Sequence, residues 1–280
     1  MSLALLRETL SEAGPRVSPF LVLGDPTPEI SVELAAAAVR GGAGLLELGL
    51  PYSDPCADGP AIQGACRRAF AASVSTTRAL SILGEIHARC PRTPLNLLVY
   101  GNLVHARGYD RFCEEAAALG ASTLLVPDIP LEECGPLSEA CARHGLGQVQ
   151  LVGPRTPPAR LARIDAAADG FLYLAAHQGI TGGPAAADRL RTELVSRTVR
   201  GARNPICLGF GLSRREHLEQ AFAAGARIAV IGSHLVRAIE QAWRAEERST
   251  QTVVESFMRA FEPLVQAAGP AASSPTSSEE

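Results

Sequence analysis

The sequence predicts an α/β fold, a (β/α)8 (TIM) barrel preceded by an extra N-terminal helix. Short apolar runs alternate with longer segments rich in Ala, Leu, Arg and Glu from about residue 18 to residue 245. The runs are apolar almost throughout, as is typical of strands buried on both faces of a parallel sheet. Eight such units fit into 280 residues, a size that single α/β barrels reach. An open doubly wound sheet is the alternative, but no GxGxxG motif follows the first strand.

Each strand is expected where an apolar run lies between turn residues. In chain order the expected strands are Pro19–Leu23, Leu45–Gly49, Leu95–Tyr100, Thr123–Val126, Gln148–Val152, Phe171–Ala175, Ile206–Gly209 and Ile228–Ile231. The helices expected between them include Pro28–Arg40, Thr76–Arg89, Asp110–Leu119, Leu131–Arg143, Asp188–Arg200 and Arg214–Ala224.

Both ends of the chain add to this pattern. Met1–Ala13 is expected to be an extra helix that plugs the bottom of the barrel, and Thr252–Ala268 a terminal helix. We therefore expect a single barrel domain over residues 1–268. The segment 269–280 is small, polar and proline-bearing, so a disordered tail is expected there.

Composition excludes several classes of function. All 26 basic residues are Arg, so Schiff-base catalysis and covalent attachment of pyridoxal phosphate, which need a Lys amine, are excluded. A net charge of −3 without a basic cluster argues against nucleic acid as a partner. No apolar run reaches membrane-spanning length, and the N-terminus lacks a signal-peptide pattern. Seven scattered cysteines without CxxC spacing favour reduced thiols in a cytoplasmic protein and argue against zinc.

Two carboxylates in the stretch Glu47–Pro60 are the strongest candidates for chemistry. Glu47 lies between two leucines near the end of the second expected strand, and Asp58 lies on the loop that follows. Active sites of such barrels gather at the C-terminal ends of the strands. Burial should raise the proton affinity of Glu47, whereas Asp58 should stay ionised, which suits an acid/base pair. The alternative is structural: Glu47 in a buried ion pair, and Asp58 as the cap of a helix that begins near Ile62.

Glycine-containing loops after the sixth, seventh and eighth strands predict a phosphate site. They read Thr181-Gly182-Gly183, Gly209-Phe210-Gly211 and Gly232-Ser233. The loops after strands 7 and 8 of such barrels commonly bind phosphate, because glycines and helix N-termini present free N–H groups.

The histidines and tyrosines add little at this level. Histidines lie singly, without HxH or HxxxH spacing, so a metal site is not expected. Of those near the mouth, His234 is expected to face solvent or to pack in the first helical turn. Tyr173 and Tyr100 lie near the ends of expected strands, where each either points into the site or simply packs in the barrel.

The segment Glu47–Gln63 (ELGLPYSDPCADGPAIQ) resembles the signature of the tryptophan synthase α subunit family. These are (β/α)8 barrels without a metal or an organic cofactor. The resemblance covers nearly the whole chain in order, apart from the C-terminal tail. It also includes Pro19-Phe20, Leu23–Pro26, Tyr100–Val104, Val126–Pro130, Tyr173, Gly179–Gly182, Gly209–Gly211 and Gly232-Ser233.

The resemblance implies retro-aldol cleavage of indole-3-glycerol phosphate to indole and glyceraldehyde 3-phosphate, without a cofactor. It implies that Glu47 is the general acid/base at indole C3 and that Asp58 binds the indole N–H. Tyr173 matches an active-site aromatic and Thr181 a closing loop. The implied phosphate contacts are Gly182, Gly211, Gly232 and Ser233. The implied lining of the indole pocket is Phe20, Ile62, Leu98, Tyr100, Leu125 and Phe210.

The resemblance also implies a partner, the tryptophan synthase β subunit, in an α2β2 complex. Asp54, Asn102 and Asp128 match positions near that interface, whereas the loop Ala175–Gln178 departs from the family's usual residues. Three alternatives therefore stay open at this point. They are a free-standing indole-producing lyase, a catalytically weak subunit that activates a β partner, and another phosphate-binding barrel enzyme.

Overall fold

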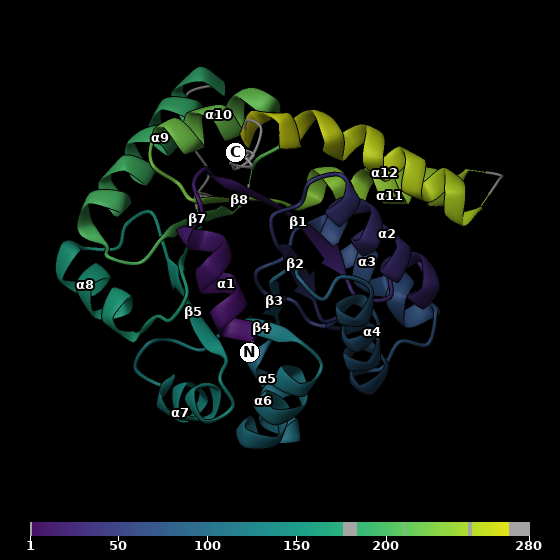
Figure 1. Cartoon of the computed structure of the whole chain (residues 1–280), viewed down its shortest axis with the longest axis horizontal. Helices are drawn as coiled ribbons and strands as arrows, with labels where there is room; N and C mark the ends of the chain where they lie inside the picture. Colours follow the sequence, from purple (N-terminus) through teal and green to yellow (C-terminus); the bar gives the residue numbers. More distant parts are fainter. Residues whose placement is uncertain (1, 176–183, 210, 246–247, 269–280) are drawn as a thin grey trace, which may run out of the picture.

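A computed structural model describes residues 2–175, 184–209, 211–245 and 248–268 of the chain. Its eight strands form a closed barrel in which neighbouring strands are parallel and follow one another in chain order, β1 to β8 (Figure 1). The predicted (β/α)8 barrel is confirmed, and the open doubly wound sheet is wrong because β8 pairs with β1. The strands are β1 (Arg16–Val22), β2 (Leu46–Gly49), β3 (Leu95–Leu98), β4 (Ala121–Leu125), β5 (Gly147–Val152), β6 (Leu172–Ala175), β7 (Ile206–Gly209) and β8 (Ile228–Ile231).

Helices surround the barrel on all sides (Figure 1). They are α1 (Ser2–Ser11), α2 (Pro28–Arg40), α3 (Pro60–Ala71), α4 (Thr76–Arg89), α5 (Gly101–Arg107), α6 (Tyr109–Ala118), α7 (Gly135–Arg143), α8 (Pro158–Ala167), α9 (Pro184–Gly201), α10 (Arg215–Ala223), α11 (Ser233–Arg244) and α12 (Thr250–Val265), followed by the 3-10 turn η1 (Gln266–Ala268). None of the described helices has the length and apolar character needed to span a membrane.

Element boundaries differ from the expectation where local chemistry sets the end. β7, β8, α2 and α4 have the predicted bounds. β3 ends at Leu98 because Tyr100 already caps α5. α7 begins at Gly135 rather than Leu131, with a proline in its first turn, a position that proline favours. The predicted disordered tail, 269–280, lies outside the described residues.

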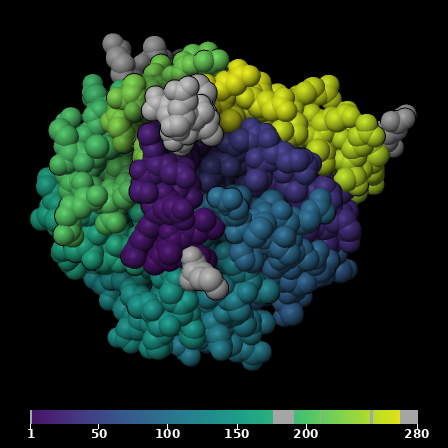
Figure 2. Space-filling view, viewed as in Figure 1, coloured from purple at the N-terminus to yellow at the C-terminus, as the bar shows by residue number. Residues whose placement is uncertain are grey.

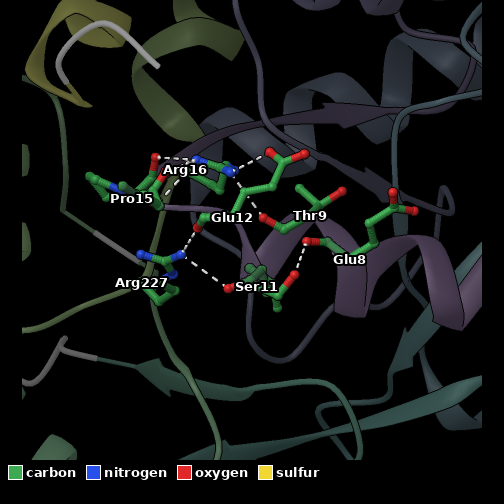
Figure 3. A network of polar contacts seen from close by, with 10 residues as sticks. Glu8, Thr9, Ser11, Glu12, Pro15, Arg16 and Arg227 are labelled. Carbon is green, nitrogen blue, oxygen red and sulfur yellow. Dashed lines mark hydrogen bonds and ion pairs between the residues drawn. The ribbon is translucent and has the colours of Figure 1, made fainter. Parts of the chain in front are cut away.

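Helix α1 closes the N-terminal end of the barrel, as the sequence predicts. In Figures 1 and 2 it crosses the centre of that end. Leu6 is buried, and the side chains of Leu3 and Leu6 lie against Gly147 and Gly170 at the starts of β5 and β6. The last turn of α1 is held by two arginines (Figure 3). Arg16 donates to the Thr9 carbonyl (3.0 Å) and to the Glu12 carboxylate (2.8 Å), and Arg227 donates to the Leu10 carbonyl.

The strand register explains why a Glu stands between two leucines in β2. Phe20, Glu47, Asn96 and Thr123 are side-by-side partners across β1, β2, β3 and β4. Registered neighbours in a parallel sheet point to the same face, and successive residues alternate between faces. Glu47 therefore points into the barrel with its row, while Leu46 and Leu48 pack outward against the helices.

Candidate active site

A cavity of about 460 Å³ opens at the C-terminal ends of the strands. Its floor comes from inward-pointing strand residues, and its walls come from the loops after β2, β7 and β8 together with the start of α11. It is lined by Phe20, Glu47, Ala57, Asp58, Gly59, Ile62, Leu98, Tyr173, Ala175, Gly211, Leu212, Ser213, Val230, Gly232, Ser233, His234 and Arg237. A volume of this size suits a small ligand.

Glu47 is the buried carboxyl group of the cavity, with 1% of its surface exposed. Burial raises its pKa to about 8, and the negative charge of Asp58 adds to the rise. Interactions with Tyr173 and Asn96 lower the pKa in part. Among the described residues, no donor lies at both the distance and the angle of a hydrogen bond to either carboxylate oxygen of Glu47. The group is therefore protonated at neutral pH and able to give up its proton near pH 8.

Asp58 is the second carboxylate, and a tyrosine holds it. The hydroxyl of Tyr100 donates to Asp58 Oδ2 (3.0 Å) and accepts from the backbone N–H of Ala57 (3.1 Å). Gln63, in the first turn of α3, donates to the Asp58 carbonyl (2.9 Å). Partial burial raises the pKa of Asp58, and the Tyr100 hydrogen bond opposes that rise. The loop thus presents one carboxylate oxygen in a fixed position.

Tyr173, on β6, lies at the base of the cavity, and its ring occupies space that is open because the neighbouring residue of β7 is a glycine. A Cβ atom at Gly209 would overlap the Tyr173 ring, so only glycine fits there. Burial and the neighbouring Glu47 raise the pKa of Tyr173 well above its usual value, which keeps its hydroxyl protonated. The phenol is therefore a hydrogen-bond donor beside Glu47, and this interaction lowers the pKa of Glu47 in part.

A second wall is built from backbone groups and from the start of α11. Gly211 has a φ of +77°, in the left-handed region that favours glycine. The first helical hydrogen bonds of α11 are donated by Leu235 and Val236 to the Gly232 carbonyl. The N–H groups of Ser233 and His234 lie ahead of these bonds, at the positive end of the helix dipole. Together with Arg237, they make this wall suited to an anion.

The structure brings most of the sequence-predicted site residues together. Lining the cavity are Glu47, Asp58, Tyr173, Phe20, Ile62, Leu98, Gly211, Gly232 and Ser233. Tyr100 holds Asp58 by a hydrogen bond but does not line the cavity. Leu125, buried at the end of β4, does not line the cavity either. Thr181, Gly182 and Phe210 lie outside the described residues.

Two cavity residues of α11 were not expected from the sequence. His234, which the sequence places near the mouth and which was expected to face solvent or to pack in the first helical turn, lines the cavity. Burial and the charge of Arg237 lower its pKa. Arg237 also lines the cavity. His234 and Arg237 are three residues apart, so they lie on one face of α11. This spacing, next to the predicted phosphate contacts Gly232 and Ser233, is the sequence signal that could have placed both in the site.

No group of three or more His, Cys, Asp or Glu side chains in the described part of the chain is placed to hold a metal ion. The polar groups that the cavity offers are carboxylates, hydroxyls, one imidazole, one guanidinium and backbone N–H groups.

Comparison with known proteins gives one consistent family. The family model "Tryptophan synthase alpha chain" matches residues 6–266. The tryptophan synthase alpha chain of Shewanella baltica is 38% identical over 243 residues, which are 87% of this chain and 89% of that protein. Tryptophan synthase subunit alpha from Legionella pneumophila superposes with a TM-score of 0.84 at 28% identity, covering 96% and 98% of the two chains. A chain of the tryptophan synthase α2β2 complex of Pyrococcus furiosus superposes with a TM-score of 0.81 at 32% identity, covering 90% and 99%.

Proposed function

The chain belongs to the tryptophan synthase alpha chain family, and we propose that its cavity is where it cleaves indole-3-glycerol phosphate to indole and glyceraldehyde 3-phosphate. The observation that supports this use of the cavity is its pairing of two unlike carboxyl groups. Glu47 is buried, with its pKa raised to about 8, and faces a cavity whose other carboxylate, Asp58, is held by Tyr100.

Glu47 is the acid that starts the reaction in this proposal. Cleavage of a carbon–carbon bond needs an electron sink, and a chain without Lys has no amine to form one as a Schiff base. The substrate supplies the sink once Glu47 transfers its proton to C3 of the indole ring, because the protonated ring is an iminium ion. Asp58 accepts a hydrogen bond from the indole N–H and stabilises the positive charge that forms there.

Glu47 is reprotonated in the bond-breaking step. Its carboxylate takes the proton of the hydroxyl on the carbon attached to C3. The bond between that carbon and C3 breaks, its electron pair returns to the ring, and the hydroxyl becomes the aldehyde of glyceraldehyde 3-phosphate. Atoms and charges balance, and Glu47 returns to its starting state. Phe20, Ile62 and Leu98 line the cavity with the apolar surface that an indole ring requires.

The phosphate of the substrate is assigned to the wall formed by the loops after β7 and β8 and by the start of α11. Gly232 and Ser233 present backbone N–H groups at the N-terminus of α11, which favours an anion, and Gly211, on the loop after β7, lines the same wall. Arg237 and His234 add a side-chain cation and a titratable donor to the same wall. Gly182 and Thr181, on the loop outside the described residues, are proposed as further contacts.

A β subunit is proposed as the partner, in an α2β2 complex. The Pyrococcus furiosus relative is solved as such a complex. In this chain Asp54 and Asp128, on the loops after β2 and β4, and Asn102, in the first turn of α5 after β3, are exposed at the same end of the barrel as the cavity. A cytoplasmic location is proposed as well, in keeping with seven cysteines that are all free thiols.

The test is steady-state indole release from indole-3-glycerol phosphate by the purified chain, alone and with a tryptophan synthase β subunit added. We expect one glyceraldehyde 3-phosphate per indole, and a rate that rises when the β subunit is present. An unchanged rate would instead support a free-standing lyase. Activation of the β reaction without indole release would support a regulatory subunit, and failure to form indole under either condition would overturn the proposed reaction.

A further inference from the structure

A row of three polar side chains crosses the interior of the barrel at the level of Glu47. Glu47 of β2 is the register partner of Asn96 of β3, and Asn96 is the register partner of Thr123 of β4. All three are buried, with exposures of 1%, 1% and 0%. Because registered neighbours in a parallel sheet share a face, Asn96 lies directly beside the Glu47 side chain.

Thr123 fixes which end of the Asn96 amide faces Glu47. The Thr123 hydroxyl donates a hydrogen bond of 2.8 Å to Asn96 Oδ1. The amide oxygen is thereby turned toward β4, so the Nδ2 group is turned toward β2. Asn96 Nδ2 is buried and makes no hydrogen bond of full geometry to the described residues, so its two N–H donors remain for the Glu47 carboxylate.

The charge state of Glu47 decides what this donor does. An N–H donor beside a carboxyl group favours the ionised form, because only the carboxylate accepts strongly at both oxygens. Asn96 therefore opposes the effect of burial, in the same direction as the Tyr173 hydroxyl. The other titratable groups that act on this place are Asp58, on the loop before α3, and Cys207, on β7.

We propose that Asn96, oriented by Thr123, is a positioning residue that stabilises the Glu47 carboxylate formed when the acid gives its proton to the substrate. The proposal rests on the proposed function. It assigns no contact with substrate to Asn96, which is absent from the cavity lining, as is Thr123. The strength of the catalytic acid is thus set by a row of side chains in the barrel interior that do not line the cavity.

The first test is the pH dependence of kcat for indole release in three variants. In N96L the donor is lost and the side-chain volume is kept, so Glu47 becomes a weaker acid. The midpoint of the alkaline limb should move up by about one pH unit, the effect of one hydrogen bond to a charged group. The rate at neutral pH should fall by about threefold to tenfold. T123V should shift the midpoint in the same direction but less, and T123S, which keeps the hydroxyl, should restore the wild-type profile.

Gln150 offers a matched control. It is also a buried amide of the sheet whose nitrogen lacks a partner of full geometry among the described residues. Its neighbour Val149 is in register with Leu125, two residues after Thr123, so Gln150 points to the helix side of the sheet. Q150L should therefore leave the midpoint unchanged. A midpoint that stays at the wild-type pH in both N96L and T123V, or that moves to lower pH, would overturn the inference.

An infrared titration of the protonated carboxyl C=O band separates this inference from the proposed function. The band that belongs to Glu47 is the one missing in E47Q, and its titration midpoint needs no substrate. That midpoint should rise in N96L and in T123V by the same amounts as the kinetic limb, and an unmoved band would reject the role of Asn96. If the wild type and every variant released no indole, the proposed function would fail, and the infrared midpoints alone would decide the inference.

Discussion

The two walls of the cavity are built in different ways. The carboxylate side consists of Glu47 and Asp58, which line the cavity, and of Asn96 and Tyr100, which lie beside them outside its lining. Each of these side chains is held by strand register or by a hydrogen bond to a neighbouring side chain. The phosphate side (Gly211, Gly232, Ser233 and Arg237) consists mainly of backbone at the end of β7 and at the start of α11. On the first side the identity of each side chain should therefore control the rate. On the second side the backbone conformation should control binding.

The largest kinetic effect among the supporting residues should come from Asp58. D58N keeps the size of the side chain and an acceptor for Tyr100, but removes the charge opposite the indole N–H. The loss of this transition-state stabilisation should lower kcat by about 10²–10³-fold with little change in KM. Y100F, which removes only the hydroxyl that holds Asp58, should lower kcat by about tenfold. If D58N raised KM and left kcat unchanged, Asp58 would belong to the binding function rather than to the chemistry.

The buried acid should also show itself in the pH dependence of stability. The pKa of Glu47 is raised from 4.5 to about 8, so between these values the unfolded chain releases a proton that the folded chain keeps. Stability is therefore lost with rising pH, by about 1.4 kcal/mol per pH unit. E47Q lacks this loss, so its free energy of unfolding relative to wild type should increase by about 3 kcal/mol between pH 5.5 and pH 8.

Urea unfolding of both proteins at the two pH values measures this difference. All other titrating groups are common to both chains and cancel. A difference that stays constant with pH would mean that the pKa of Glu47 is not raised, and the carboxylate side would then lack its acid.

Substitution of glycine by alanine should have different effects on stability and kinetics at Gly209, which lies against Tyr173, and at Gly211, on the phosphate side. In G209A the new methyl group overlaps the Tyr173 ring, which should cost about 1–3 kcal/mol of stability and lower kcat. In G211A the methyl group meets no atom of the described residues within 4 Å, so the expected cost is the strain of a φ of +77°, at about 1 kcal/mol. Its kinetic effect should be on KM. Thermal unfolding together with kcat and KM for both variants checks this, and a loss of kcat in G211A alone would reverse the assignment of the sides.

The smallest effect should come from Arg237. R237A removes one exposed cation from the phosphate side while the backbone donors remain, so KM should rise by about threefold to tenfold and kcat should stay the same. The rise should weaken at high salt, because the interaction is screened. R78A is the matched control, since Arg78 lies on α4, pairs with Glu85 and does not line the cavity. Equal KM changes in the two variants would remove Arg237 from the phosphate site.

The sequence predicts the fold and the carboxylate pair for a shared physical reason. Strands buried on both faces must be apolar, so the eight strand runs are visible and the charged residue within one of them is conspicuous. Glu47 was found in that way, and its burial and raised pKa agree with the expectation from its leucine neighbours. The glycine loops follow from the position of each loop after its strand.

The residues that were missed depend on relations between elements. Asn96 interrupts the run Leu95–Leu98 as Glu47 interrupts its own strand, but only the register of three strands shows that it stands beside Glu47. Arg237 is one of many arginines in helices, and its direction depends on how α11 packs. The hydrogen bond of Tyr100 to Asp58 joins residues 42 positions apart in the chain. Such contacts follow from tertiary geometry and leave no local pattern.

The most direct test of the two-sided cavity is single-turnover cleavage of bound indole-3-glycerol phosphate by E47Q, with binding measured separately by calorimetry. Gln keeps the shape of the side chain and cannot transfer the proton. We predict that the dissociation constant stays within about threefold of wild type, while indole formation from the bound substrate falls by at least about 10²-fold. E47Q that binds weakly but cleaves its bound substrate at the wild-type rate would contradict the account, because Glu47 would then hold the substrate rather than supply the proton.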